Sequence, residues 1–160
     1  MANKCKIDGF ENLDKLFRAV SRPQEFCEKA VGAAAPILLK STKKSVHRAI
    51  HEPPTARKGE PERTGALERS FMASDPKTNE YGTFTCIQPV GNRTDGKTSD
   101  KGKPLHYAAQ AAFLEWGTSN GQAPSPFRHR AVKDAEGECA ETMEKTFLQG
   151  VSAHWPVEYD

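Results

Sequence analysis

The side chains with the spacing of a metal site are two histidines, His47 and His51. They are four residues apart, so on a helix they would lie on one face, with Glu52 directly after them. The helical zinc-protease pattern instead places a glutamate directly after the first histidine, where this sequence has Arg48. The other histidines stand apart from this pair. We therefore predict no metal site and no bound cofactor.

Glu115 is the carboxylate best placed for acid–base chemistry, because it lies between Leu114 and Trp116 in an apolar run. No second acid or base forms a recognisable motif with it. The sequence also has no phosphate-binding loop, no dinucleotide-binding glycine pattern, no nucleophile elbow and no zinc-deaminase signature. We predict that the protein is not an enzyme, and we keep a hydrolase centred on Glu115 as an alternative.

A cluster of basic residues forms one face of a predicted helix: Lys40, Lys43, Lys44 and Arg48. Such a face could contact the phosphates of a nucleic acid. However, it has no interleaved aromatic residues, and the sequence pI of about 8.3 is below that of a typical nucleic-acid-binding domain. The alternatives are a nucleic-acid-binding module and a solvated helix face.

Length and composition predict one domain over residues 1–160, with a structured core over 10–150. There is no apolar run of membrane-spanning or signal-peptide length, so we expect no membrane contact and synthesis in a cytoplasm. Four cysteines without close spacing predict free, mostly buried thiols.

The formal net charge of +2 is distributed unevenly along the chain. Residues 1–58 have twelve Lys or Arg against six Asp or Glu, which gives +6, and residues 132–160 have two against seven, which gives −5. These opposite charges could meet within one molecule or between neighbouring copies. Charge counting does not separate the two possibilities.

Apolar spacing predicts a short helix over 13–20 and a second helix from about Pro23 to Ile50, with a kink or break at Pro36. Residues 51–63 read as a flexible loop. Residues 70–74 and 80–90, separated by 75–79, predict an antiparallel hairpin. A long mobile loop over 90–104 follows.

Residues 106–118 could be a helix or a strand, because alanines favour the first and aromatics the second. The last helix is predicted to start with Ser125 as cap and Pro126 at its first position, to stop at Gly150, and to leave residues 151–160 as a tail. We expect Phe127 and Phe147 to be buried against the sheet. The fold class is α+β, with N-terminal helices and a C-terminal helix packed on a small, mainly antiparallel sheet.

Three segments, in this order and spacing, carry a resemblance: RTGALERSF (63–71), YAAQAAFLEWGT (107–118) and APSPFRHRAV (123–132). Together they resemble the head–tail joining and tail-completion family of bacteriophages with long, non-contractile tails. The positions that match the family are Thr64, Gly65, Leu67, Ser70, Tyr107, Ala108, Phe113, Glu115, Trp116, Gly117, Thr118, Pro124, Pro126, Phe127, Arg130 and Ala131. The sequence departs from the family at Trp116, which stands for phenylalanine or tyrosine, and at His129, and its stretch from Tyr107 to Glu115 is longer.

The resemblance implies that residues 107–118 form a strand and that residues 113–131 form a rigid corner leading into the last helix. Phe113 and Trp116 are an odd number of residues apart, so on a regular strand they could not both point inward. One of them would then serve an interface or lie at a bulge. Alternatively, the segment is a plain strand-to-helix connection with no interface role.

The resemblance also implies a structural virion protein that forms a ring at the head–tail junction or the tail end, around the DNA channel. Its partners would be the head connector and adaptor proteins and the tail tube or tail terminator protein. An alternative is that it is itself the tail terminator, which caps the tube. We expect a hexameric ring in the particle, a monomer in dilute solution, and assembly in the cytoplasm of a bacterial host.

The predicted loop over 90–104 has a net charge of +2, from Arg93, Lys97, Lys101 and Lys103 against Asp95 and Asp100. In a ring it would point into the channel or toward the next ring. Its charges would suit transient contact with the phosphates of passing DNA. The alternative is an inert, solvated loop.

Overall fold

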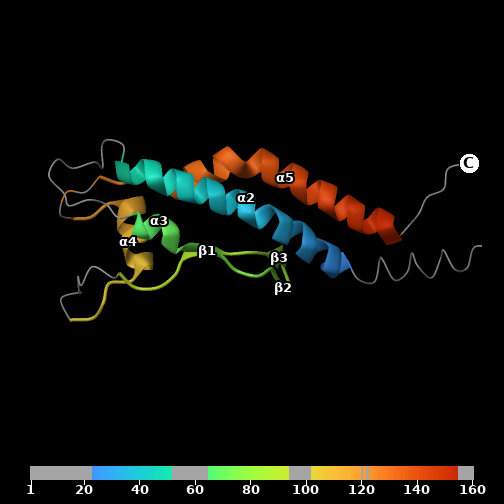
Figure 1. Ribbon diagram of the computed structural model, residues 1–160, viewed down its shortest axis with the longest axis horizontal. Helices are drawn as coiled ribbons and strands as arrows, with labels where there is room; N and C mark the ends of the chain where they lie inside the picture. Colours follow the sequence, from blue (N-terminus) through green and yellow to red (C-terminus); the bar gives the residue numbers. More distant parts are fainter. Residues whose placement is uncertain (1–22, 52–64, 94–101, 120, 122, 155–160) are drawn as a thin grey trace, which may run out of the picture.

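The computed structural model describes residues 23–51, 65–93, 102–119, 121 and 123–154. Two long helices, α2 (Pro23–His51) and α5 (Phe127–His154), lie side by side and antiparallel along the molecule (Figure 1). No helix in these ranges is long and apolar enough to cross a membrane. The helix predicted over 13–20 and nearly all of the loop predicted over 51–63 lie outside the described residues.

The helix α2 continues through Pro36, so of the predicted kink or break, the break is wrong. Pro36 is exposed, and contacts with α5 on both sides of it hold α2 together. The Ser41 hydroxyl donates to the Ala131 carbonyl at 2.8 Å, and the Cys139 thiol donates to the Ala34 carbonyl at 3.8 Å. Packing of this kind overrides the local preference of a proline.

Small buried residues allow α2 and α5 to approach closely. These are buried alanines of both helices: Ala30, Ala34 and Ala35 on α2, and Ala131 and Ala135 on α5. Alanine has a high helix propensity and a short side chain, so one residue type favours both the helices and their close packing.

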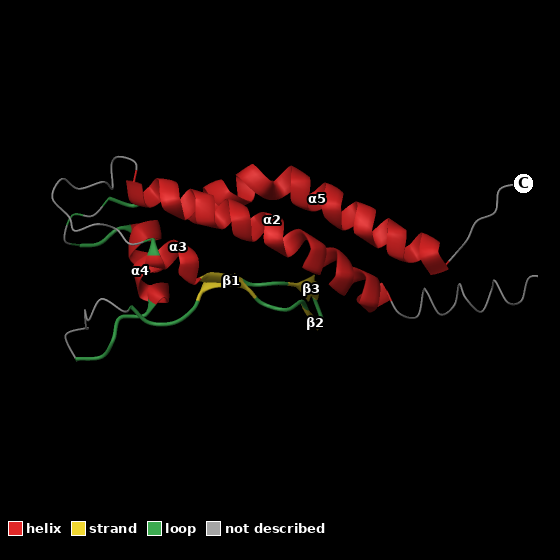
Figure 2. Cartoon of the chain, viewed as in Figure 1, coloured by secondary structure: helices red, strands yellow, loops and turns green. Residues whose placement is uncertain are grey.

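A four-stranded hairpin-like segment runs beneath α2 (Figure 2). At the base of this segment, strand β1 (Phe71–Ala73) pairs with β4 (Ile87–Pro89). At its tip, β2 (Lys77–Asn79) pairs with β3 (Gly82–Phe84), and both pairs are antiparallel. The predicted antiparallel hairpin is therefore confirmed, although part of the expected connection is itself a strand. The turn follows from Asn79, whose side-chain oxygen accepts hydrogen bonds from the backbone N–H groups of Tyr81 and Gly82.

Residues Tyr107–Trp116 form a helix, α4, so the strand implied by the resemblance is wrong. The buried residues of this segment are Tyr107, Ala111, Leu114 and Glu115, which follow the period of a helix and not that of a strand. A five-residue helix, α3 (Ala66–Ser70), precedes β1. Together, the helices and the small antiparallel sheets give an α+β fold.

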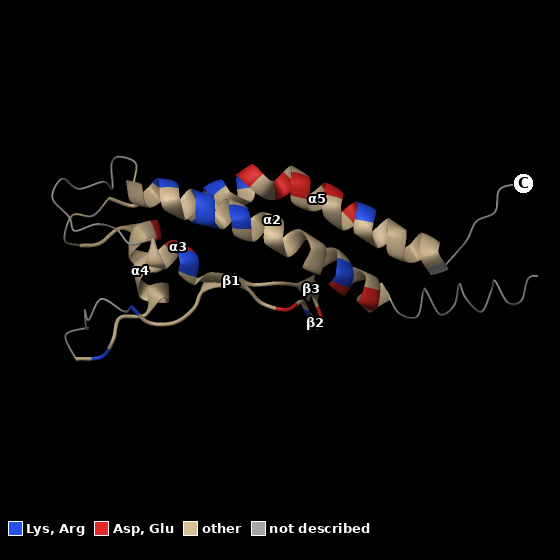
Figure 3. Cartoon of the chain, in the orientation of Figure 1, with Lys and Arg blue, Asp and Glu red and all other residues tan. Residues whose placement is uncertain are grey.

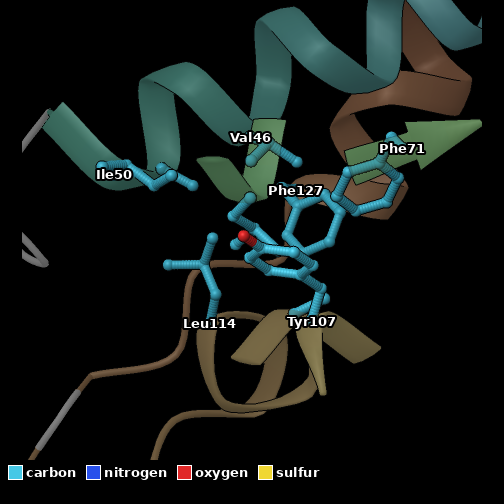
Figure 4. Close-up of a cluster of buried hydrophobic side chains, with 9 residues drawn as sticks. Val46, Ile50, Phe71, Tyr107, Leu114 and Phe127 are labelled. Carbon is cyan, nitrogen blue, oxygen red and sulfur yellow. The ribbon is translucent and has the colours of Figure 1, made fainter. Parts of the chain in front are cut away.

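The core lies where α3, β1 and α4 meet the C-terminal half of α2 and the first turn of α5 (Figure 4). Phe127 is fully buried, as predicted, and its ring packs edge-on against Phe71 at 5.8 Å between centroids. The other members of this cluster are Val46, Ala49, Ile50, Leu67, Tyr107, Ala111 and Leu114. Phe127 therefore ties the start of α5 to the sheet.

At the opposite end of the helix pair, Phe147 is only half-buried and packs on α2, which corrects its predicted place against the sheet. Its ring meets Phe26 edge-on at 6.3 Å between centroids. The predicted stop at Gly150 is also wrong, because α5 continues to His154. Gly150 instead makes room for Phe26, since a Cβ at Gly150 would lie 2.6 Å from the Cδ1 atom of that ring.

The thiols that the structure describes are free, but they are not mostly buried as predicted. Cys27 and Cys139 are half-buried and Cys86 is exposed. Burial raises the pKa of the Cys139 thiol, and the neighbouring charge of Glu138 raises it further, against a backbone hydrogen bond that lowers it.

The contact between Gly150 and Phe26 gives a test of the packing at this end. Alanine favours a helix over glycine by about 1 kcal/mol, so Gly150→Ala would stabilise α5 if space allowed. Since the added Cβ would meet the Phe26 ring, we expect a net loss of about 1–3 kcal/mol in the free energy of unfolding, measured by urea denaturation.

Gly137→Ala is the matched control in the same helix, because nothing lies within 4 Å of its added Cβ. We expect this variant to gain up to about 1 kcal/mol. Equal stabilisation by both substitutions would contradict the packing of Phe26 on Gly150.

Candidate assembly surface

Several matched positions serve the core and not a surface. Gly65 precedes α3 with φ 65°, a left-handed conformation that favours glycine. The Ser70 hydroxyl donates to the Leu67 carbonyl at 2.7 Å. Leu67, Ser70, Tyr107, Phe127 and Ala131 are buried, Ala108 is exposed, Thr118 is half-buried, and Thr64 lies outside the described residues.

Glu115 joins α4 to the start of α5. Its Oε2 atom accepts a hydrogen bond from the backbone N–H of Arg128 at 3.1 Å, so the carboxylate caps the N-terminus of α5. A negative charge there is also favoured by the helix dipole. Sequence reasoning did not find this role, because the two residues lie in different helices.

A second set of backbone contacts closes the corner between α4 and α5. Gly117 ends α4 with φ 77°, and its N–H donates to the Phe113 carbonyl at 2.9 Å. The Ser125 N–H donates to the Leu114 carbonyl at 2.8 Å. Pro124 and Pro126 are exposed in the segment that leads into α5. These bonds fix the direction in which α5 leaves α4.

The predicted start of the last helix is corrected in two details. The helix α5 begins at Phe127, so Pro126 immediately precedes it and is not its first residue. The Ser125 hydroxyl accepts a hydrogen bond from Nη2 of Arg130 at 2.7 Å, and the cap is Glu115. The buried Nε atom of Arg130 has no partner among the described residues.

Phe113 and Trp116 both point outward, one turn apart on α4. They are 47% and 68% exposed, respectively, which a strand would not have allowed on one face. The guanidinium carbon of Arg128 lies 5.6 Å from the centre of the Trp116 ring. Val132, one turn after Arg128 on α5, is also exposed. We name Phe113, Trp116, Arg128 and Val132 the corner surface.

Exposed aromatic and arginine side chains of this kind are typical of protein interfaces. Trp and Arg are enriched among the residues that contribute most to binding between proteins. Arg128 is held by its stacking on Trp116, so less side-chain freedom is lost when a partner binds. The corner surface is therefore the candidate assembly surface.

The predicted basic face is present on α2. Lys40, Lys44 and Arg48 are exposed at successive helical turns, and Lys43 is half-buried. Arg48 approaches Asp134 of α5, with 3.8 Å between Nη1 and Oδ2. Figure 3 shows acidic positions gathered along the middle of α5 and basic positions on α2. The opposite charges thus meet partly within one molecule, through an exposed pair that contributes little to stability.

The predicted loop over 90–104 is closed at its base by the backbone. Asn92 pairs with His106 in an antiparallel bridge, and the Arg93 N–H donates to the Leu105 carbonyl at 2.8 Å. Arg93 is half-buried and Lys103 is exposed. Lys97 and Lys101 lie outside the described residues.

The two histidines with metal-like spacing lie together on α2. The rings of His47 and His51 are 4.4 Å apart between centroids. Nδ1 of His47 lies 3.1 Å from Oε2 of Glu68 on α3. Over the part of the chain that the structure describes, no three His, Cys, Asp or Glu side chains gather into a group able to hold a metal ion.

Comparison with known proteins finds no match for this chain among protein-family models, curated proteins or solved structures. The resemblance to phage neck and tail-completion proteins therefore depends on the three sequence segments alone. What the structure adds is where those segments lie relative to one another.

The capping role of Glu115 is testable by substitution. Glu115→Ala removes the acceptor for the Arg128 N–H, so we expect the free energy of unfolding in urea to fall by about 0.5–2 kcal/mol. Glu115→Gln keeps an oxygen acceptor and loses the charge at the helix N-terminus, for which we expect a smaller loss of about 0.3–1 kcal/mol.

Glu136→Ala, at an exposed site on α5, is the matched control, and its stability should be close to that of the wild-type chain. If Glu115→Ala unfolds at the same urea concentration as Glu136→Ala, Glu115 does not cap α5.

Proposed function

We propose that the protein is a structural component of a long-tailed bacteriophage particle, which forms a ring around the DNA channel at the head–tail junction or the tail end. One observation carries this proposal. The first segment of the resemblance is distant in the sequence from the other two, yet all three contribute to one core cluster: Leu67 and Phe71 from the first, Tyr107 and Leu114 from the second, and Phe127 from the third.

The shared cluster supports the proposal because it makes the three motifs one structural unit. The unit also presents the corner surface to solvent, which suits a protein whose task is contact with other proteins. Glu115, the best candidate for catalysis, is instead engaged in capping α5.

In the particle, copies of this chain assemble side by side into a hexameric ring. The head connector and adaptor proteins contact one side of the ring, and the tail tube or tail terminator protein contacts the other. The second candidate within this class is the tail terminator itself. The isolated protein stays a monomer in dilute solution, since its contacts with neighbours are weak until the docking surface of the particle brings copies together.

Removal of the gene tests the proposal and separates its two forms. In the phage that encodes this chain, a neck protein should be present in purified virions, and its loss should leave filled heads and finished tails unjoined. Loss of a tail terminator should instead give tails of irregular length. Joined, infectious particles at normal yield without the protein would refute both forms.

Complementation by purified variants locates the active surface. Adding the Phe113→Ala/Trp116→Ala variant to a lysate that lacks the protein should join heads to tails much less efficiently than adding the wild-type protein. The control is Tyr81→Ala, which removes an 89% exposed aromatic residue at the far tip of the hairpin. Both variants should be folded by circular dichroism.

The segment 94–101 gives a separate prediction about the channel. Replacing the segment with a short Gly-Ser linker leaves the backbone bridge between Asn92 and His106 and the hydrogen bond from Arg93 to Leu105 in place. We therefore expect the chain to fold normally. We expect fewer infectious particles, because the positive charges of Lys97 and Lys101 no longer contact passing DNA.

A variant of unchanged length, Lys97→Gln/Lys101→Gln, separates the effect of charge from that of length. A normal yield from both variants would show that this segment has no role in joining or in DNA passage.

A further inference from the structure

The helix α5 has cations where its dipole disfavours them. Its first turns contain Arg128, Arg130 and Lys133 and no acidic residue. The positive end of the helix dipole lies at the N-terminus, so cations there are unfavourable by a few tenths of a kcal/mol or more. The Glu115 carboxylate and the hydrogen bond from Arg130 to Ser125 offset part of this cost, but neither Arg128 nor Lys133 forms an ion pair with another described residue. Such departures are frequent at functional sites.

A second unusual surface lies toward the other end of α5. Glu141, Glu144 and Leu148 are spaced three and four residues apart, so they lie in one row on the helix. All three are exposed, and Leu148 is 55% exposed although it is a large apolar residue. We name these three residues the acidic ridge.

No described residue neutralises the charge of the acidic ridge through an ion pair. Glu141 and Glu144 form no ion pair with any other described residue, and Lys145, although one turn beyond Glu141, forms none with it. Carboxylates three residues apart on a helix repel each other. The ridge therefore combines two carboxylates that form no ion pair with another described residue and an exposed apolar side chain.

The chemistry of the two surfaces is complementary. The corner surface offers two aromatic rings, a valine and a positively charged guanidinium, whereas the acidic ridge offers a leucine beside two carboxylates. Arg128 could bind Glu141 or Glu144 while Trp116 and Phe113 cover Leu148. The basic face of α2 fits the ridge less well, because it contains no exposed apolar residue and Arg48 already lies near Asp134.

These two surfaces cannot meet within one molecule. Arg128 and Glu144 are sixteen residues apart on one continuous helix. At a rise of 1.5 Å per residue this separates them by roughly 24 Å. Only another molecule can bring a corner surface to an acidic ridge.

We propose that the corner surface of one copy binds the acidic ridge of α5 in the next copy. The contact joins two different surfaces, so each copy has one of each to offer, and repetition of the contact closes into a ring or continues as a filament. This inference rests on the proposed ring and deepens it, because it names the two surfaces through which neighbouring copies meet.

Charge exchange tests the contact with the purified full-length chain. At about 0.5 mM protein, where even a weak interface is populated, and about 20 mM salt, sedimentation equilibrium should show self-association of the wild-type chain. Arg128→Glu, or Glu141→Lys/Glu144→Lys together, should weaken this association about tenfold or more. Glu136→Lys, at an exposed acidic position outside the ridge, should not.

The decisive experiment is to restore self-association by mixing the two charge-reversed variants. Each variant repels itself, but in an equal mixture the reversed corner of the Arg128→Glu variant meets the lysine-bearing ridge of the other variant. The unchanged corner of that other variant meets a ridge that keeps its glutamates. The mixture should therefore associate again, as should a single chain with all three substitutions. Leu148→Ala should also weaken association, and Tyr81→Ala should not.

Four results would overturn the contact: a wild-type chain that stays monomeric under these conditions, self-association unchanged by either charge reversal, a failed rescue, or a ridge variant with lowered folding stability. In the last case the ridge would pack on the chain's own residues. Loss of duplex DNA binding by Arg128→Glu, with unchanged self-association, would instead assign the corner surface to nucleic acid.

The outcomes also separate this contact from the proposed function. Charge-exchange rescue in a protein that is missing from virions would refute the neck role and leave the contact standing. Normal particles assembled from the charge-reversed variants would refute the contact and leave the neck role standing.

Discussion

The rest of the structure depends on the packing of Phe127 against Phe71 beneath Val46 of α2. All three side chains have 1% exposure or less, and they come from α5, β1 and α2. This contact joins the hairpin to both long helices, and Leu67, Tyr107 and Leu114 of the same cluster add the short helices to it. Truncation of a buried phenylalanine costs about 3–5 kcal/mol, a large part of the stability of a domain this size. The core cluster lies at one end of the helix pair, and that end also presents the corner surface.

The corner surface is rigid because polar contacts add to this apolar packing. Glu115 holds the first turn of α5, and Ser125 is bonded both to the end of α4 and to the guanidinium of Arg130. Each of these bonds contributes about 0.5–1.5 kcal/mol, with those to charged groups at the upper end or above. Their larger effect is geometric, since they fix Trp116 and Arg128 relative to each other before any partner binds. Less conformational entropy is then lost on association.

Local sequence patterns correctly predicted the elements whose apolar side chains recur with a regular period. They failed where a contact between residues distant in the sequence determines the local structure. The extent of α2, the hairpin and the burial of Phe127 follow from apolar spacing and turn residues. Residues 107–116 could not be assigned, because alanines and aromatics favour different structures and only the core selects the helix. The helix α5 continues past Gly150, where the Phe26 ring packs, and the cap of α5 comes from Glu115 in another helix. None of these contacts can be recognised from the residues that are neighbours in the sequence.

In the proposed assembly, the helix pair would act as a spacer between the two contact surfaces of each copy. If copies meet through the corner surface and the acidic ridge, both surfaces belong to α5, and the angle between successive copies depends on how straight and fixed that helix is. The contacts of Ser41 with Ala131 and of Cys139 with Ala34 hold α5 to α2 along its length, and buried alanines bring the two helices close. A spacer held in this way repeats one angle at every contact, which is what closure into a ring of defined size requires. A flexible connection between the two surfaces would give assemblies of many sizes. In the proposed assembly, the long helix pair would set the angle at which each copy meets the next, and with it the symmetry of the ring.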